Sequence, residues 1–198
     1  MKIKSHLIFF VVALTSFAAS SQGTFVYDQQ SSMLEGALPY GAGGAIQQMT
    51  TPYGQSFIPT LSAVDFFRLN LNDNNPSNNL GATVYVNLRT NSISGPILAT
   101  TALVTLTNGF TGVVNFFFSG SKSLTPGTTY YFQPVVQSGD VWNIAIAEYG
   151  YPNGSAFNNG SPVASDYWFR EGIVVPEPSV SLLVVLGGGV VAWRHRKK

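Results

Sequence analysis

The stretch Leu80-Gly-Ala-Thr-Val-Tyr-Val-Asn-Leu-Arg89 alternates apolar residues with more polar ones at a period of two. Successive side chains of a β-strand point to opposite faces, so this alternation predicts a strand with one face in a core and the other turned outward. The expected inner face consists of Leu80, Ala82, Val84, Val86 and Leu88.

Strand patterns of the same kind flank this stretch on both sides. They are rich in Val, Ile, Phe and Tyr and bounded by Gly, Pro and Asn, and no stretch of three turns has a helical period. Ser138-Gly139-Asp140 predicts a hairpin between its flanking strands, and Asn108-Gly109 predicts a tight turn. The prediction is an all-β fold, a single antiparallel β-sandwich with jelly-roll-like topology over residues 22–175. The other expected strands are 25–28, 55–58, 63–71, 97–106, 113–118, 129–136, 141–148 and 166–171.

The first twenty residues have the three-part order of a secretory signal peptide. Lys2 and Lys4 precede an apolar run over 7–17, and small residues follow at 18–21. The run is shorter than the roughly 20 residues that span a bilayer as a helix. We therefore predict that 1–20 is a signal peptide removed by signal peptidase.

The other end of the chain combines a proline-flanked motif, an apolar run and a basic cluster. Pro176-Glu177-Pro178 precedes an almost wholly apolar run over 179–193, and residues 194–198 carry four basic side chains. Prolines interrupt regular structure, so they separate this tail from the domain before it. A helix over 179–193 is about 22 Å long at 1.5 Å per residue, short for a hydrocarbon core of about 30 Å. The basic cluster favours a cytoplasmic end. We predict a short transmembrane helix that the membrane holds transiently.

This three-part tail over 176–198 resembles the PEP-CTERM sorting signal of exported bacterial proteins. The resemblance implies that a membrane transpeptidase, an exosortase, recognises Pro176, Glu177 and Pro178. It further implies that the tail is removed and the domain is left at the cell surface or in the extracellular matrix. The alternative is a permanent membrane anchor, and both alternatives place the domain outside the cytoplasm.

Setting the two ends aside changes the charge of the domain. Residues 22–175 retain four basic and eight acidic side chains, a net charge of −4, although the whole chain has +1. Binding of nucleic acid needs clustered Lys and Arg, so no nucleic-acid partner is expected. Both histidines, His6 and His195, lie in the ends, and the chain has no cysteine. Without them no Ser-His-Asp triad, thiol nucleophile or His/Cys metal site can form. We predict a protein that is not an enzyme and has no cofactor and no metal.

Aromatic residues in the last third of the domain suggest a surface for a polysaccharide. Sugar rings stack on aromatic faces, and the sequence places Trp142, Tyr149, Tyr151, Tyr167 and Trp168 in this region. Trp142 has the strand parity of Ile144 and Ile146, so it is expected in the core. Tyr149, Tyr151 and Trp168 are the candidates for carbohydrate binding, and core packing is the alternative for each of them.

Two further candidate sites rest on oxygen ligands and carboxylates. The Asn-rich loop over 70–79 contains the single carboxylate of Asp73, so we expect a solvated turn rather than a calcium site. Glu148, Asp166 and Glu171 offer carboxylates for glycoside hydrolysis, although most such groups serve only to solubilise a surface.

A second, looser resemblance concerns the domain itself. Gln55-Ser56-Phe57 and the turn over 124–131, with the letters LTPGTTYY, resemble segments of sandwich domains in exported bacterial proteins with C-terminal sorting signals. This resemblance implies no catalytic residues. The function we expect is a structural or adhesive role at the cell surface or in the extracellular matrix, in contact with exopolysaccharide. The alternatives are a secreted carbohydrate-active enzyme that uses Asp/Glu pairs and an anchored envelope protein without a ligand.

Overall fold

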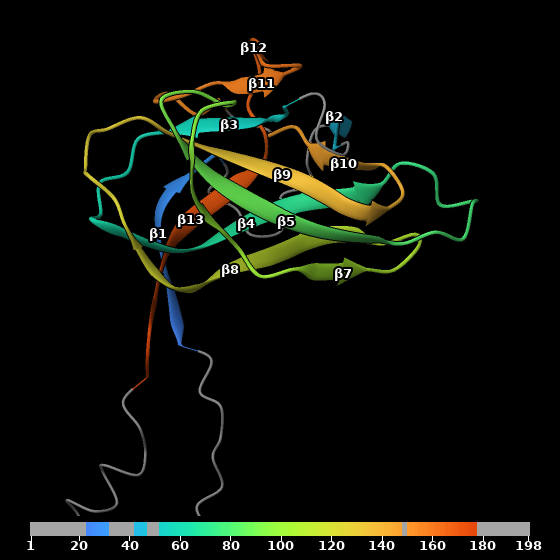
Figure 1. Ribbon diagram of the computed structural model, residues 1–198, viewed down its shortest axis with the longest axis horizontal. Coiled ribbons are helices and arrows are strands. Elements are labelled where there is room, and N and C mark those ends of the chain that lie inside the picture. Colours follow the sequence, from blue (N-terminus) through green and yellow to red (C-terminus); the bar gives the residue numbers. More distant parts are fainter. Residues whose placement is uncertain (1–22, 32–41, 47–51, 148–149, 178–198) are drawn as a thin grey trace, which may run out of the picture. The chain divides into compact units, whose positions relative to one another are not determined.

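The computed structural model describes residues 23–31, 42–46, 52–147 and 150–177, and residues 42–46 by their backbone alone. Its compact unit, Thr24–Val175, is an all-β structure of two antiparallel sheets, here called sheet A and sheet B (Figure 1). The arrangement is consistent with a β-sandwich. The strands are β1 Thr24–Gln30, β2 Ala42–Ile46, β3 Gly54–Phe57, β4 Ala63–Asp73, β5 Ala82–Thr90, β6 Ile97–Thr100, β7 Val104–Leu106, β8 Thr111–Ser123, β9 Tyr130–Gly139, β10 Trp142–Ala145, β11 Ala156–Asn158, β12 Ser161–Pro162 and β13 Phe169–Val175.

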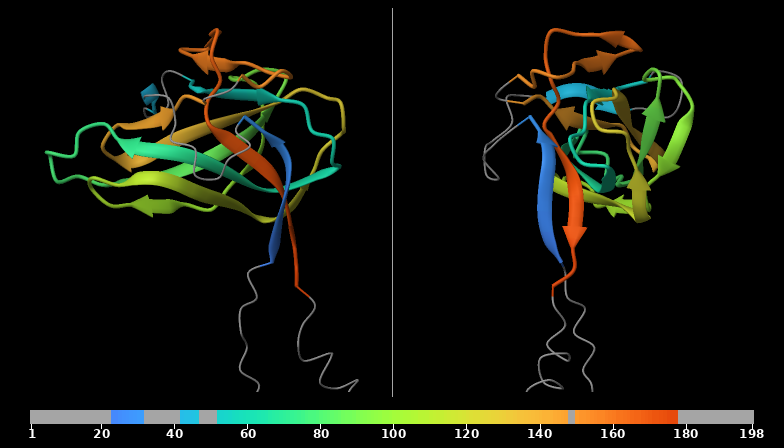
Figure 2. Two further views of the ribbon diagram at one scale, coloured as in Figure 1. Left: turned by 180° about the vertical axis from the view of Figure 1, so that it is seen from behind. Right: turned by 90° about the vertical axis from the view of Figure 1, so that its left-hand side faces the viewer.

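Sheet A is organised around the long strand β4. In the described part of the chain, β8 lies along one edge of β4, and β13 and β10 share its other edge. β1 then pairs with β13, and β2 pairs with β10. The register places Thr24 opposite Val175, so the first and last strands of the compact unit lie side by side (Figure 2).

Sheet B is organised around the pair β5 and β9. Its order is β12-β11-β3-β9-β5-β6, and β7 also pairs with β5. β5 is the strand predicted from residues 80–89, and Val84, Val86 and Leu88 on its inner face are fully buried as expected. Leu80 departs from the prediction, because it precedes the strand and is 53% exposed.

Aromatic side chains from both sheets form the centre of the core. The rings of Phe67 and Phe169, from sheet A, each lie 5.1 Å from the ring of Phe132 in sheet B. Phe57 packs edge-on against Phe67 at 5.6 Å. Such pairs contribute about 0.5–1.5 kcal/mol each beyond the burial of their area. Trp142 is fully buried, which confirms the expectation from its strand parity.

The predicted hairpin at Ser138-Gly139-Asp140 is wrong. β9 belongs to sheet B and β10 to sheet A, so the short turn crosses between the layers. β10 pairs with β4 and β2 in sheet A, whereas β9 pairs with β5 and, over residues 130–132, with β3 in sheet B.

Other strand boundaries also differ from the prediction. The strand expected over 97–106 is divided into β6 and β7, and the last strand begins at Phe169 rather than at residue 166. β2, β11 and β12 were not predicted. The tight turn at Asn108-Gly109 is confirmed: Phe110 N donates to Thr107 O at 3.1 Å, and Gly109 has a φ of +74°.

Several predictions fall on residues that the structure does not describe. The signal peptide, Pro178 and the apolar run over 179–193 lie outside the described residues. Within the described ranges, the structure has no helix of the length and hydrophobicity that crossing a bilayer requires.

Candidate functional site

The expectation that Tyr151 and Trp168 are exposed is wrong. Trp168 is 0% exposed, and the Arg170 guanidinium lies 5.2 Å from its ring. Tyr151 is 5% exposed; its hydroxyl donates to Gln29 Oε1 at 2.8 Å and accepts from Ile58 N at 3.2 Å. Burial raises the pKa of Tyr151 to about 12. Both side chains are buried, which agrees with the alternative of core packing. Tyr149, the third candidate, lies outside the described residues.

The carboxylate of Asp166 is engaged in a structural role. It accepts hydrogen bonds from Gln55 Nε2 at 2.6 Å and from Tyr151 N at 2.7 Å. Gln55 Oε1 in turn accepts from Tyr167 N at 3.1 Å. The Asp166 carboxylate therefore connects β3, through Gln55, to the chain segment that contains Tyr151. Both of its oxygens accept hydrogen bonds from protein donors. Glu148, its proposed companion, is not among the described residues.

Glu171 lies inside the sandwich and does not solubilise a surface. It is opposite Gln29 on β1 and Phe67 on β4, on the same side of β13 as Phe169. The residue is 0% exposed, and its carboxyl group lies near the Asp28 carboxylate and the backbone of Gln29. Burial, and then the nearby negative charge of Asp28, raise the pKa of Glu171 to about 9. The carboxyl group is therefore uncharged at neutral pH.

The Asn-rich loop over 70–79 has the hydrogen bonds of a capped turn. Asp73 accepts from Asn75 N and from Gly109 N, both at 2.8 Å. Asn78 Oδ1 accepts from Leu80 N at 2.8 Å. No group of three or more potential metal-ligating residues occurs in the part of the chain that the structure describes. The hydrogen bonds favour the solvated turn over the calcium site.

The outer face of sheet B carries a set of polar side chains that sequence analysis did not identify. On β5, Asn87 and Arg89 point away from the buried Val86 and Leu88. Across the sheet, Asn87 is opposite Gln133, and Arg89 is opposite Tyr131.

These polar side chains form a cross-strand hydrogen-bonded row, here called the polar ladder. Thr100 Oγ1 donates to Asn87 Oδ1 at 2.7 Å, and Asn87 Nδ2 donates to Gln133 Oε1 at 3.5 Å. Arg89 Nε donates to the same Gln133 oxygen at 2.7 Å, and Arg89 Nη1 donates to Gly95 O. Asn87 is 2% exposed and Gln133 6% exposed. Buried polar groups that are satisfied in this way hold one arrangement.

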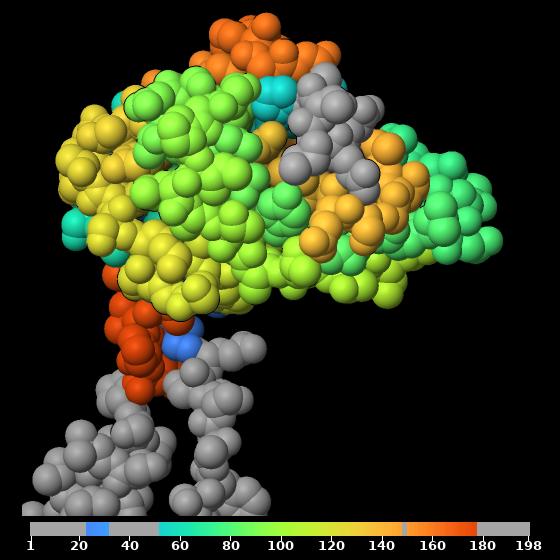
Figure 3. Space-filling view, viewed as in Figure 1, coloured from blue at the N-terminus to red at the C-terminus, as the bar shows by residue number. Residues whose placement is uncertain are grey.

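Three half-buried aromatic residues surround the polar ladder and are here called the aromatic rim: Tyr85, Tyr131 and Phe157. Tyr131 packs edge-on against Phe157 with ring centroids 5.6 Å apart. Tyr85 lies on the same face of β5 as Asn87, two residues along the strand. Figure 3 views the molecule from the side of sheet B, where the light green segment containing the β5–β6 loop stands out.

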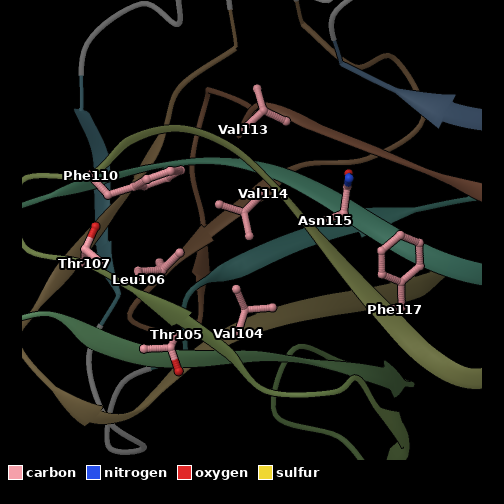
Figure 4. A pocket seen from close by; sticks show the side chains of 9 residues that line it. All are labelled: Val104, Thr105, Leu106, Thr107, Phe110, Val113, Val114, Asn115 and Phe117. Carbon is pink, nitrogen blue, oxygen red and sulfur yellow. The ribbon is translucent and has the colours of Figure 1, made fainter. Parts of the chain in front are cut away.

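A separate groove of about 440 Å³ opens where the edges of the two sheets diverge. It lies between β7 and β8, and Figure 4 shows Val104, Leu106 and Val114 gathered between these strands. The edges meet beyond the groove, where Ala102 N donates to Phe117 O at 2.8 Å. The lining residues are uncharged and mostly apolar, so the groove offers mainly apolar contact.

No protein-family model matches the chain, and no curated protein is significantly similar to it.

The sequence predicts which face of β5 carries the polar side chains of the ladder, but not which residues lie beside them. Tyr85, Asn87 and Arg89 form the polar half of the alternation that predicted β5. What the sequence could not supply was the register, which places Gln133 beside both Asn87 and Arg89. Strand pairing joins residues more than forty positions apart, and a period of two fixes a face but not a neighbour.

Proposed function

We propose that this protein is an exported β-sandwich with a structural or adhesive role at the cell surface or in the extracellular matrix. The observation that carries this proposal is the pairing of β1 with β13, which puts Thr24 opposite Val175. The expected signal peptide ends shortly before Thr24, and the expected sorting motif begins directly after Val175. The folded unit therefore fills the chain between the two targeting segments, and removal of either segment leaves its strands intact.

The topology that fits this proposal is jelly-roll-like. Successive long strands alternate between the sheets: β4 in sheet A, β5 in sheet B, β8 in sheet A and β9 in sheet B. In such a fold the terminal strands are held by pairing with distant segments, which suits a domain released by cleavage at both ends.

Export and sorting are tested by the intact mass of the mature protein from its native host. We expect it to lack about the first twenty residues, through signal peptidase, and the tail from the sorting motif onward, through an exosortase. Replacing Pro176, Glu177 and Pro178 together by Ala should leave the tail attached. A wild-type mature protein that retains residues beyond Glu177 and stays in the membrane would favour the permanently anchored alternative.

Contact with exopolysaccharide is placed by this proposal at the aromatic rim rather than at Tyr149, Tyr151 and Trp168. Tyr131 and Phe157 are half-buried and adjacent, and Arg89 lies directly across from Tyr131. Aromatic faces beside fixed hydrogen-bonding groups are the combination by which proteins orient polar ligands with apolar surfaces.

A polysaccharide panel with Tyr131→Ala tests this placement. Loss of one stacked ring should weaken binding about fivefold, which corresponds to roughly 1 kcal/mol. Phe117→Ala is the matched control, because Phe117 is an aromatic residue on sheet A with 40% exposure. Equal weakening by both variants, or no binding of any polysaccharide by the wild-type protein, would contradict an adhesive role at the rim.

The carbohydrate-active enzyme receives no support from the positions of its carboxylates. Both oxygens of Asp166 are occupied by protein donors, and Glu171 is enclosed in the core. Polysaccharide turnover abolished by Asp166→Asn or Glu148→Gln would reverse this conclusion.

A further inference from the structure

The side chain of Arg89 is a positive charge for which the described residues supply no anion. Its hydrogen-bond acceptors are Gln133 Oε1 and Gly95 O, both uncharged. Partial burial lowers the pKa of Arg89 from its usual value, and Tyr85 opposes this shift. A cation withdrawn from water without a counter-charge attracts an anionic ligand more strongly than a fully hydrated one does.

The guanidinium is held in one orientation by the polar ladder. Nε is fixed by Gln133, which is 6% exposed, and Nη1 is fixed by Gly95 O at the end of the β5–β6 loop. In the described part of the chain, Nη2 has no acceptor. Because two of its nitrogen atoms are already held by hydrogen bonds, the planar guanidinium of Arg89 loses little conformational entropy when its remaining donors bind a carboxylate.

The surroundings of Arg89 favour a sugar ring that carries the anion. Tyr131 is directly opposite Arg89 across β5 and β9, and Phe157 supports the edge of Tyr131 at 5.6 Å. A saccharide lying over this pair would place an equatorial carboxylate near Nη2 while its apolar face rests on the rings. Residues 22–175 have a net charge of −4 with Arg89 included, so their other charges sum to −5, and Arg89 is the one charged residue among the polar ladder and the aromatic rim.

We propose that the outer face of sheet B at Arg89 and the aromatic rim binds an acidic polysaccharide through the carboxylate of a uronic-acid unit. The inference rests on the proposed adhesive function and specifies its ligand class. Arg89 is the residue that selects for the acid, and Tyr131 and Phe157 supply contact that acidic and neutral sugars share.

The test compares binding of alginate, an unsulfated uronic-acid polymer, with binding of neutral dextran by the full mature protein at low and moderate salt. We expect alginate to bind more tightly than dextran and to weaken as salt rises. Arg89→Gln should weaken alginate binding at least tenfold and leave dextran binding unchanged. Lys122→Gln is the matched control, since it removes the same charge from a half-buried position on β8 of sheet A, and it should change alginate binding less than twofold.

Arg89→Lys covers the case in which Arg89→Gln does not fold. It keeps the charge but not the planar fork, so a several-fold loss of alginate affinity is expected. Equal losses in Arg89→Gln and Lys122→Gln would overturn the inference, because net charge alone would then explain binding. If the wild-type protein binds alginate and dextran equally well and Arg89→Gln changes neither affinity, the proposed selectivity for an acidic polysaccharide is wrong. The adhesive function would still be supported. Absence of binding to both polymers would overturn the two together.

Discussion

Arg89 and Glu171 are both ionisable residues on strands of the sandwich, and their surroundings are opposite. Arg89 lies on the outer face of sheet B, where Gln133 Oε1 and Gly95 O accept its hydrogen bonds. Glu171 lies on the inner face of sheet A, fully buried, with the Asp28 carboxylate as the nearby charge. The first keeps its charge, and the second has its pKa raised to about 9 by burial and by Asp28. Strand parity places Glu171 in the core, where burial disfavours the ionised carboxylate, whereas the guanidinium of Arg89 keeps its charge because its ordinary pKa lies far above neutral.

The difference has consequences for stability. A carboxyl group with a raised pKa binds its proton more tightly in the folded chain than in the unfolded chain, where its value is near 4.5. Between those two pH values the folded state holds more protons at Glu171, so the stability that this group contributes is fully present below about 4.5 and is lost as pH rises through about 9. The slope approaches about 1.4 kcal/mol per pH unit for one group.

Glu171→Gln should produce the largest effect. The amide needs no proton, so the variant should be more stable than the wild-type protein by about 2–4 kcal/mol at pH 8 and similar to it at pH 5. The measurement is the free energy of unfolding in urea from pH 5 to pH 9.

Asp140→Asn provides a matched control for that measurement. Asp140 is a half-buried carboxylate that accepts from Asn78 Nδ2, a contact that the amide oxygen can also accept. The wild-type pH dependence should persist in this variant. A wild-type stability that is flat or rises between pH 6 and pH 9 would show that Glu171 is ionised in the fold.

Asp166→Ala sharpens the comparison by removing a carboxylate that is fully bonded. Tyr151 N would lose its acceptor and Gln55 Nε2 would keep only Ser56 O at 3.3 Å, so the free energy of unfolding should fall by about 2–3 kcal/mol. Urea unfolding at pH 7 measures this change. A smaller loss than about 1 kcal/mol would mean that water replaces the carboxylate at low cost.

Gln133→Ala tests the Arg89 side of the comparison and should have the smallest effect. It removes the acceptor shared by Arg89 Nε and Asn87 Nδ2, at a cost of about 1–2 kcal/mol. Gln133→Glu keeps an acceptor and adds a counter-charge, so it should unfold at higher urea than Gln133→Ala. If Gln133→Glu instead unfolds at lower urea than Gln133→Ala, the polar ladder does not hold Arg89 in place.

Much of the fold could be predicted from the sequence. The alternation over 80–89 located β5, and the parity of Trp142 with Ile144 placed both in the core. The hairpin at Ser138-Gly139-Asp140 failed because turn chemistry reports a reversal of the chain but not which sheet the next strand joins. Tyr151 and Trp168 were misplaced because both lie outside the strands of the structure, and the strand expected over 166–171 begins only at Phe169.

By itself, the sequence determined the all-β class, the charge of the domain, the absence of histidine and cysteine between its ends, and the expectation of export. These properties depend on amino-acid composition and on the local period of apolar residues, both of which can be read from consecutive residues. The tertiary structure alone decided that Glu171 is enclosed, that Asp166 is fully bonded and that Gln133 lies against Arg89. These facts depend on register and layer, which arise only when strands distant in sequence pair and the two sheets pack together.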